Sequence, residues 1–185
     1  MARVKQWRIN QQLSYLLFDP ISRRGAVIDP QPALASCYVQ TLEQLGVGNA
    51  YVLFTGAVAS GVKVPGQVLG ADMFSAGALS GPVAPDALAL GESRIRIIVD
   101  PATARVAYAC DGLVFTGLWW LAGGLRPFVA SEPEADVDKL PLLQLPDDYV
   151  IYPGRVSRGL CISSVAQEKA LCCDPLLAAV GAHYG

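Results

Sequence analysis

The chain begins with short apolar runs that are separated by turn-forming residues. The runs over residues 13–18 and 25–30 predict two strands, because each is bounded by residues that favour turns. Asp19-Pro20-Ile21-Ser22 lies between them and predicts the turn of a hairpin. Apolar residues then recur every three or four positions, so residues 33–45 predict an amphipathic helix that stops at Gly46.

A third strand is predicted over residues 50–55, and the composition then changes. Residues 56–92 are rich in glycine, alanine and proline, which indicates loops with one short strand near residues 67–70. Strands resume at residues 94–99, where Arg94 and Arg96 alternate with isoleucines. The long middle segment therefore separates two strand-rich halves.

The second half carries a clear hairpin signal. Asp111-Gly112 lies between apolar runs over residues 105–110 and 113–116, and an Asp-Gly pair in this position is typical of a tight hairpin turn. Another strand is predicted over residues 149–152.

Three helices are predicted in the C-terminal part of the chain. One is an acidic helix over residues 131–139. A second covers about 164–172 and begins with a capping box, Ser164-Val165-Ala166-Gln167. Asp174-Pro175 predicts the start of a last short helix. This order of hairpins and helices predicts an α/β chain, an αββα sandwich of two mixed β-sheets flanked by helices, with residues 1–185 forming one domain.

The composition is apolar and weakly charged. Hydrophobic residues make up 52% of the chain and charged residues 16%, so either the core is extensive or an apolar surface is covered by a partner. The net charge of −2 gives no electrostatic footprint for nucleic acid. No uncharged apolar stretch approaches the roughly 20 residues of a membrane span, and the N-terminus lacks the apolar run of a signal peptide. We therefore expect a cytoplasmic protein.

Cysteine and histidine usage narrows the chemistry. The five cysteines are widely spread and odd in number, which favours reduced thiols over a disulfide framework. Cys172 and Cys173 are adjacent, so they form either a redox-active pair or two small residues at a helix end. The single histidine, His183, lies near the C-terminus and cannot build a site of several imidazoles.

Five segments, taken in order, resemble the metallo-β-lactamase superfamily, closest to its glyoxalase II and persulfide dioxygenase branch. They are residues 14–20, 26–30, 114–117, 145–154 and 162–169. The resemblance implies a metallo-β-lactamase-like fold. In this family a strand is followed by the metal motif Thr-His-x-His-x-Asp-His, and here the corresponding residues, Thr55 to Gly61, contain no histidine.

The same comparison implies that all the family's metal-ligand positions have been lost together. They fall on Gly56, Val58, Ser60, Gly61, Leu118 and Arg155. The stretch that would carry a further family histidine, residues 99–104, has none. Glycine, valine and leucine offer no donor atom, and an arginine is a cation. The resemblance therefore implies a pseudoenzyme with no metal, no other cofactor and no catalytic residue.

Four residues are candidates for binding a ligand at the old site. Leu118-Trp119-Trp120-Leu121 is predicted to be strand, so its two tryptophans would face opposite sides and serve as core, as a partner interface or as a ligand platform. Arg126 matches an arginine-containing loop of the persulfide dioxygenase branch by resemblance. Together with Arg155 it could bind an anion such as a thiol-peptide carboxylate, or both could be ordinary surface arginines.

Three functions follow from these observations. The first is a non-catalytic binding or structural subunit that self-associates or docks on another protein. The second is a divergent protein of thiol or sulfur metabolism, which the resemblance alone would link to glutathione or a persulfide. The third is a sensor that binds a small ligand in the remodelled pocket.

Overall fold

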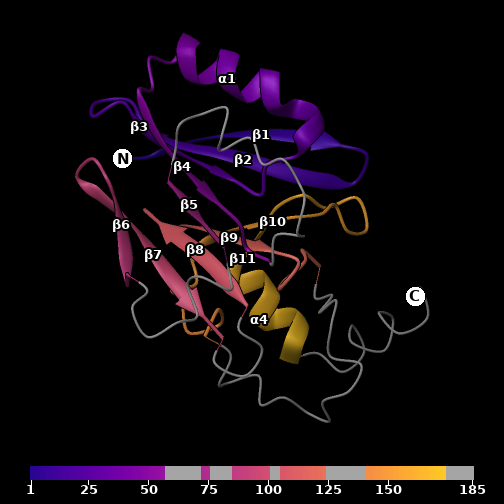
Figure 1. Cartoon of the computed structure of the whole chain (residues 1–185). Coiled ribbons are helices and arrows are strands. Elements are labelled where there is room, and N and C mark those ends of the chain that lie inside the picture. The colour runs from indigo at the N-terminus through magenta and orange to yellow at the C-terminus, as the bar shows by residue number, and fades with distance from the viewer. Residues whose placement is uncertain (57–71, 76–84, 101–104, 124–140, 174–185) are drawn as a thin grey trace.

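Two β-sheets stack face to face, and helices cover their outer faces (Figure 1). The computed structural model describes residues 1–56, 72–75, 85–100, 105–123 and 141–173. Both sheets are mixed, because each contains parallel as well as antiparallel strand pairs. The predicted fold class, two mixed sheets flanked by helices, is confirmed.

The first sheet has the strand order β1-β2-β3-β4-β5. Its strands are β1 (Arg3–Ile9), β2 (Gln12–Asp19), β3 (Arg24–Ile28), β4 (Asn49–Leu53) and β5 (Met73–Phe74). β1, β2 and β3 are antiparallel neighbours, whereas β3, β4 and β5 run parallel. The parallel arrangement places the C-terminal ends of β3 and β4 at one edge of the sheet.

The second sheet has the strand order β11-β10-β9-β8-β7-β6. Its strands are β6 (Ala87–Leu90), β7 (Ser93–Val99), β8 (Val106–Cys110), β9 (Leu113–Gly117), β10 (Val150–Pro153) and β11 (Ser163–Ser164). β9 and β10 are parallel, and the other pairs are antiparallel. The C-terminal ends of β9 and β10 are therefore also neighbours.

Helices pack on the outer face of each sheet (Figure 1). A 3₁₀ turn (Pro32–Leu34) leads into α1 (Ala35–Gln44), and Tyr38 and Leu42 of this helix pack on Leu16, Phe18 and Val27 of the first sheet. The second helix, α4 (Val165–Cys173), contributes Val165 to a cluster on the other sheet. Inner-face residues such as Leu13, Leu17, Ile28, Leu53, Leu90 and Ile95 form the central core.

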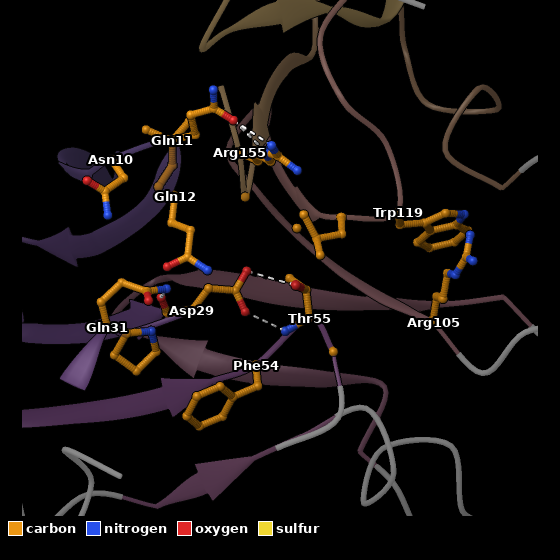
Figure 2. Close-up of a pocket in the computed structure, with 16 residues that line it drawn as sticks. Asn10, Gln11, Gln12, Asp29, Gln31, Phe54, Thr55, Arg105, Trp119 and Arg155 are labelled. Atoms are coloured by element: carbon orange, nitrogen blue, oxygen red, sulfur yellow. Dashed lines mark hydrogen bonds between the residues drawn. The ribbon is translucent and has the colours of Figure 1, made fainter. Parts of the chain in front are cut away.

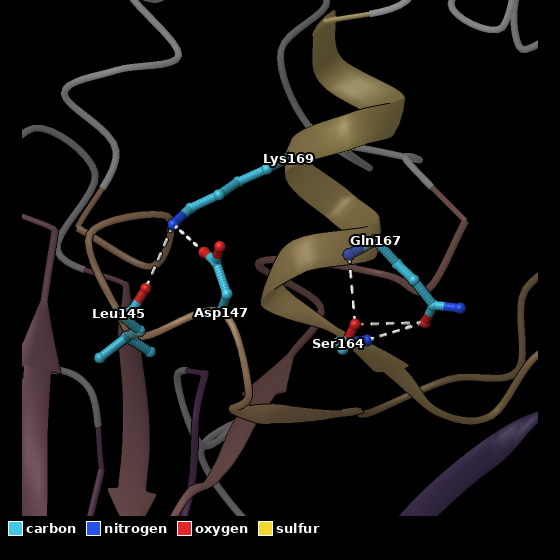
Figure 3. Close-up of polar contacts among 5 residues, drawn as sticks. All are labelled: Leu145, Asp147, Ser164, Gln167 and Lys169. Carbon is cyan, nitrogen blue, oxygen red and sulfur yellow. Dashed lines mark hydrogen bonds and ion pairs between the residues drawn. The ribbon is translucent and has the colours of Figure 1, made fainter.

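Local sequence signals explain several boundaries. Asp111 and Gly112 have φ values of 49° and 81°, as the predicted tight hairpin turn requires. Gly46 has φ of 64° and ends α1 where the sequence predicted. The capping box is also confirmed. The Gln167 backbone N–H donates to Ser164 Oγ at 3.2 Å, and the Ser164 backbone N–H donates to Gln167 Oε1 at 3.1 Å (Figure 3).

Four strands lie where no strand was predicted, namely β1, β6 and the two-residue strands β5 and β11. β1 carries Arg3, Lys5 and Arg8, so its sequence lacks the clean alternation of a half-buried strand, yet it pairs with β2 along its whole length. It is an edge strand, and charged residues are tolerated there because water solvates them. β6 lies within the segment that was assigned to loops, although Leu88 and Leu90 do alternate toward the core.

The prediction that Leu118-Trp119-Trp120-Leu121 forms a strand is wrong. β9 ends at Gly117, and a turn follows. Gly117 has φ of 56°, and the Trp119 N–H donates to Thr116 O at 2.9 Å, so the chain leaves the sheet before the tryptophans. The predicted strand near residues 67–70 and the predicted helices over 131–139 and after Asp174 lie outside the described residues.

Candidate functional site: a cleft at the strand ends

A cleft of about 910 Å³ opens where the C-terminal ends of β3, β4, β9 and β10 meet (Figure 2). One side is polar and is formed by the β1–β2 turn, Asn10-Gln11-Gln12, together with Gln31. Phe54, Leu118 and Trp119 add an apolar side. The volume falls in the range of small-molecule sites.

The β1–β2 turn is bonded to the segment that follows β10. The Val156 N–H donates to Gln11 O at 2.7 Å, and the Leu13 N–H donates to Gly154 O at 2.9 Å. The Arg155 side chain lies between these bonds and donates to Gln11 Oε1 from Nε and Nη2, at 3.0 and 2.5 Å (Figure 2). These contacts hold an exposed guanidinium at the rim of the cleft.

Asp29 lies in the cleft directly after β3. Its φ of 48° ends the strand, and its half-buried carboxylate accepts two hydrogen bonds from Thr55, one from the backbone N–H at 2.8 Å and one from the hydroxyl at 2.7 Å (Figure 2). Burial raises the pKa of Asp29 to about 6, and the Thr55 hydrogen bonds oppose this rise. The carboxylate is therefore ionised at neutral pH but only weakly acidic.

The backbones of β9 and β10 meet closely beside Thr55. A methyl group on Gly117 would overlap the Thr55 side chain, and one on Gly154 would lie 2.9 Å from the Gly117 backbone. The Gly154 N–H donates to Gly117 O at 2.7 Å. Gly117 also has a positive φ, so only glycine satisfies both its conformation and its contact with Thr55.

Two buried tyrosines connect the sheets beneath the cleft. The Tyr15 hydroxyl of β2 donates to Pro153 O at the end of β10, at 2.5 Å. The Tyr108 hydroxyl of β8 donates in the other direction, to Phe54 O after β4, at 2.9 Å. Burial raises the pKa of both phenols well above the ordinary value, so they remain neutral donors.

A buried carboxylate anchors the loop that carries the tryptophans. Glu168 of α4 accepts hydrogen bonds from Trp120 Nε1 at 2.9 Å, from the Gly123 N–H at 2.9 Å and from Ser163 Oγ at 2.5 Å. Trp119 and Trp120 are both buried in the cluster under α4, and Trp119 also borders the cleft. The loop is therefore held from the side away from the cleft.

Compared by sequence, the chain matches no protein-family model and no functionally curated protein. Compared by structure, it superposes on ETHE1 from Myxococcus xanthus with a TM-score of 0.69 and 20% identity, over 90% of this chain and 81% of that one. It also superposes on a metallo-β-lactamase from Staphylococcus aureus subsp. aureus COL with a TM-score of 0.70 and 18% identity, over 92% of this chain and 61% of that one. The chain therefore has the metallo-β-lactamase fold.

The likeness concerns the fold, since the identities are low. The chain spans less than two thirds of the staphylococcal protein. Within the described part of the chain, no helix is long and apolar enough to cross a membrane. The metallo-β-lactamase fold that the sequence resemblance implied is thus confirmed by structure, while activity is a separate question.

The donor atoms of the cleft do not suit a metal ion. Among the described residues, no group of three or more histidine, cysteine, aspartate or glutamate side chains could hold one. Asp29 is the one carboxylate among the described residues that line the cleft, and a single carboxylate is too few ligands for a stable metal site. Arg155 adds a positive charge, which disfavours a cation. The described residues of the cleft therefore do not fit a bound metal ion.

The structure brings together several residues that the sequence singled out. Gly56, Leu118, Trp119 and Arg155 all border the cleft, whereas Trp120 is buried behind it. Other candidates lie outside the described residues; they are Val58, Ser60, Gly61, Arg126, His183 and the side chain of Cys173.

Asp29, Thr55 and Gln12 also border the cleft but were not predicted. One signal was present for Asp29: it lies between an apolar strand and a proline, where a polar side chain reaches a sheet edge. Thr55 begins the segment that corresponds to the family's metal motif, whereas Gln12 has no local signal, because it reaches the cleft through the tertiary fold.

Proposed function

We propose that this chain is a metal-free binding protein that takes a small ligand in the cleft and does not turn it over. One observation carries the proposal: the cleft is open and has a polar and an apolar side, although the positions expected to carry metal ligands hold Gly56, Leu118 and Arg155. A protein that kept this fold but bound nothing in the cleft would gain stability if apolar side chains filled the space.

The free thiols of this protein favour its location in a reducing compartment such as the cytoplasm. Cys37, Cys110 and Cys161 are free thiols in the structure. Burial raises the pKa of Cys110 to about 12, which makes this thiol unreactive at neutral pH. These features favour a binding role over thiol chemistry at Cys110.

A pair of glycine variants tests the binding role. Gly56 borders the cleft and Gly48 does not, and a side-chain atom added at either meets nothing within 4 Å. We expect Gly56→Trp to fill the cleft and Gly48→Trp to leave it open. Ligand-observed NMR with a fragment library should detect binding to wild type and Gly48→Trp that Gly56→Trp abolishes.

Two results would contradict the proposal. One is equal fragment binding by both tryptophan variants. The other is zinc or iron that remains at one equivalent after dialysis, because a resident metal would require donor atoms that the described residues do not supply.

Association with a protein partner, including a second copy, is a second candidate. Large apolar side chains are exposed at Ile21, Leu118, Leu160 and Ile162, with exposed fractions from 45% to 86%. Light scattering after size exclusion tests it: we expect a dimer or larger species that Leu160→Ser or Ile21→Ser weakens. A monomer at all concentrations would remove self-association.

A further inference from the structure

The cleft contains a carboxylate, Asp29, whose charge is balanced by no cation in the described part of the chain. Both Asp29 hydrogen bonds come from Thr55, a neutral residue. Among the described residues, no lysine or arginine lies within salt-bridge distance of Asp29. Each carboxylate oxygen can accept about two hydrogen bonds, so one acceptor site on each oxygen is unused. Because Asp29 is half-buried, solvation by water compensates its charge only in part.

The same cleft contains a guanidinium, Arg155, that has no carboxylate partner among the described residues. Arg155 donates from two nitrogens to the neutral amide of Gln11, and no carboxylate pairs with it in the described part of the chain. A guanidinium has five N–H donors, so several remain for a ligand. An arginine with free donors is well suited to bind a carboxylate in two-point geometry.

The two charges border one cavity but do not pair with each other. In Figure 2, Arg155 is held beside Gln11, and Asp29 lies apart from it next to Thr55, with the end of the Gln12 side chain on the other side of Asp29. Arg105 also borders the cleft, but it lies on the opposite side, beside Trp119 (Figure 2). On its polar side the cleft therefore presents a negative pole, Asp29, and a positive pole, Arg155, while Arg105 adds a second cation on the opposite side.

We propose that the cleft binds a small zwitterion, with its ammonium group on Asp29 and its carboxylate on Arg155. This assignment rests on the proposed binding function and specifies the ligand class. A ligand with one charge would leave one pole unbalanced in a partly desolvated site, whereas a zwitterion balances both. The amides of Gln12 and Gln31 can bond polar groups of the ligand, and Phe54 and Leu118 can contact a short methylene chain.

A series of ω-amino carboxylates from glycine to 6-aminohexanoate tests the assignment by isothermal titration calorimetry. The chain length that binds best reports the separation of the two poles. At that length, we expect the zwitterion to bind at least about tenfold more tightly than the matched carboxylate without an amine and the matched amine without a carboxylate.

Charge-removing variants identify the two poles. Asp29→Asn should lower the zwitterion affinity to about that of the matched carboxylate, and Arg155→Gln should lower it to about that of the matched amine. Asp148→Asn and Arg158→Gln change exposed charges outside the cleft lining, and they should leave the affinity unchanged. The comparison of probes on the wild-type protein does not depend on whether a variant folds.

Equal affinity of the zwitterion and either half-probe, or equal losses in the cleft and control variants, would overturn the assignment. If no probe of the series binds while fragments still bind in a way that Gly56→Trp abolishes, the assignment is wrong but the binding function stands. If Gly56→Trp changes neither measurement, the binding function itself is wrong.

Discussion

At the scale of single residues, the cleft depends on the contact of Asp29 with Thr55. These residues are 26 positions apart in sequence, and they meet because β3 and β4 are parallel neighbours that end together. The carboxylate is half-buried, and only the two Thr55 donors favour its charged form. This arrangement has a measurable effect on stability.

The pH dependence of stability should reveal Asp29. Its pKa is about 6 in the folded protein and about 3.9 in an unfolded chain, so the folded state holds the extra proton between these values. The free energy of unfolding contributed by Asp29 therefore falls as the pH rises from about 4 to about 6, by an amount on the order of 2 kcal/mol. Urea unfolding at pH 4.5 and 7.0 measures this loss.

Asp29→Asn should remove that loss, because asparagine does not titrate. Exposed Asp148→Asn is the matched control and should keep it. Other carboxylates, such as Asp19, whose pKa is lowered by hydrogen bonds from Ser22, are common to all three proteins. An identical pH dependence of wild type and Asp29→Asn would show that Asp29 has an ordinary pKa.

Gly117→Ala tests the close contact of β9 with Thr55. Gly117 combines a positive φ with a contact that leaves no room for a methyl group. We expect the substitution to lower the free energy of unfolding by at least about 2 kcal/mol. Gly112→Ala is the control, since Gly112 also has a positive φ but open space around it, and should cost about 1 kcal/mol. Equal losses would mean that the Thr55 contact is unimportant.

At the scale of elements, α4 does more than cover the second sheet. Its Glu168 side chain binds the loop after β9 through Trp120 and Gly123, and it also binds Ser163 before the helix. A buried carboxylate is costly unless hydrogen bonds compensate for its desolvation, and here three donors do so. The helix and the loop beside the cleft are therefore coupled.

Glu168→Gln should weaken this coupling. An amide nitrogen in place of one carboxylate oxygen would face an N–H or O–H donor, so we expect a loss of about 2 kcal/mol in unfolding free energy. Fluorescence of Trp120 should change in the folded state, because its Nε1 partner is altered. Glu43→Gln, at an exposed position of α1, provides the control, and it should change neither measurement. Unchanged fluorescence and stability would contradict the role assigned to Glu168.

Sequence patterns predicted the elements whose signals are local. The Asp111-Gly112 turn and the Ser164–Gln167 cap were found because each is defined within four residues. β1 was missed because an edge strand can carry charges on a face that water covers. Trp119 and Trp120 were assigned to a strand because their apolar run looks continuous, whereas the positive φ of Gly117 ends the strand. A glycine's φ cannot be read from sequence.

At the scale of the whole molecule, the two sheets are joined by reciprocal hydrogen bonds. Tyr15 of the first sheet bonds Pro153 O of the second, and Tyr108 of the second bonds Phe54 O of the first. Tyr15 also contacts the rings of Phe115 and Tyr152, at centroid distances of 5.3 and 5.4 Å. These contacts fix the strand ends that border the cleft.

Tyr15→Phe and Tyr108→Phe should each lower the free energy of unfolding by about 1 kcal/mol, because each leaves a buried or partly buried carbonyl without its donor. The double variant should differ from the sum of the single variants by about 0.5 kcal/mol or more, since both bonds hold the same pair of sheets. Urea unfolding of the four proteins measures this difference. Strict additivity would show that the two hydrogen bonds act independently.

The architecture around the cleft could not be predicted at this scale. The resemblance implied the fold, and the structure confirms it, but the amide-lined polar side depends on contacts between distant segments. Gln11 and Arg155, for example, are 144 positions apart. No periodicity or motif marks such a pair, because their meeting depends on how the β1–β2 turn lies against the segment after β10.

The exposure of three cleft positions makes this chain a starting point for enzyme design. Gly56, Leu118 and Arg155 are all exposed to the cleft, and a side-chain atom added at Gly56 meets nothing within 4 Å. Substitutions at exposed positions usually change stability by less than about 0.5 kcal/mol. Histidine or aspartate could therefore be introduced at these positions with little loss of stability, so that a set of metal-ligating side chains could be built at the mouth of the cleft.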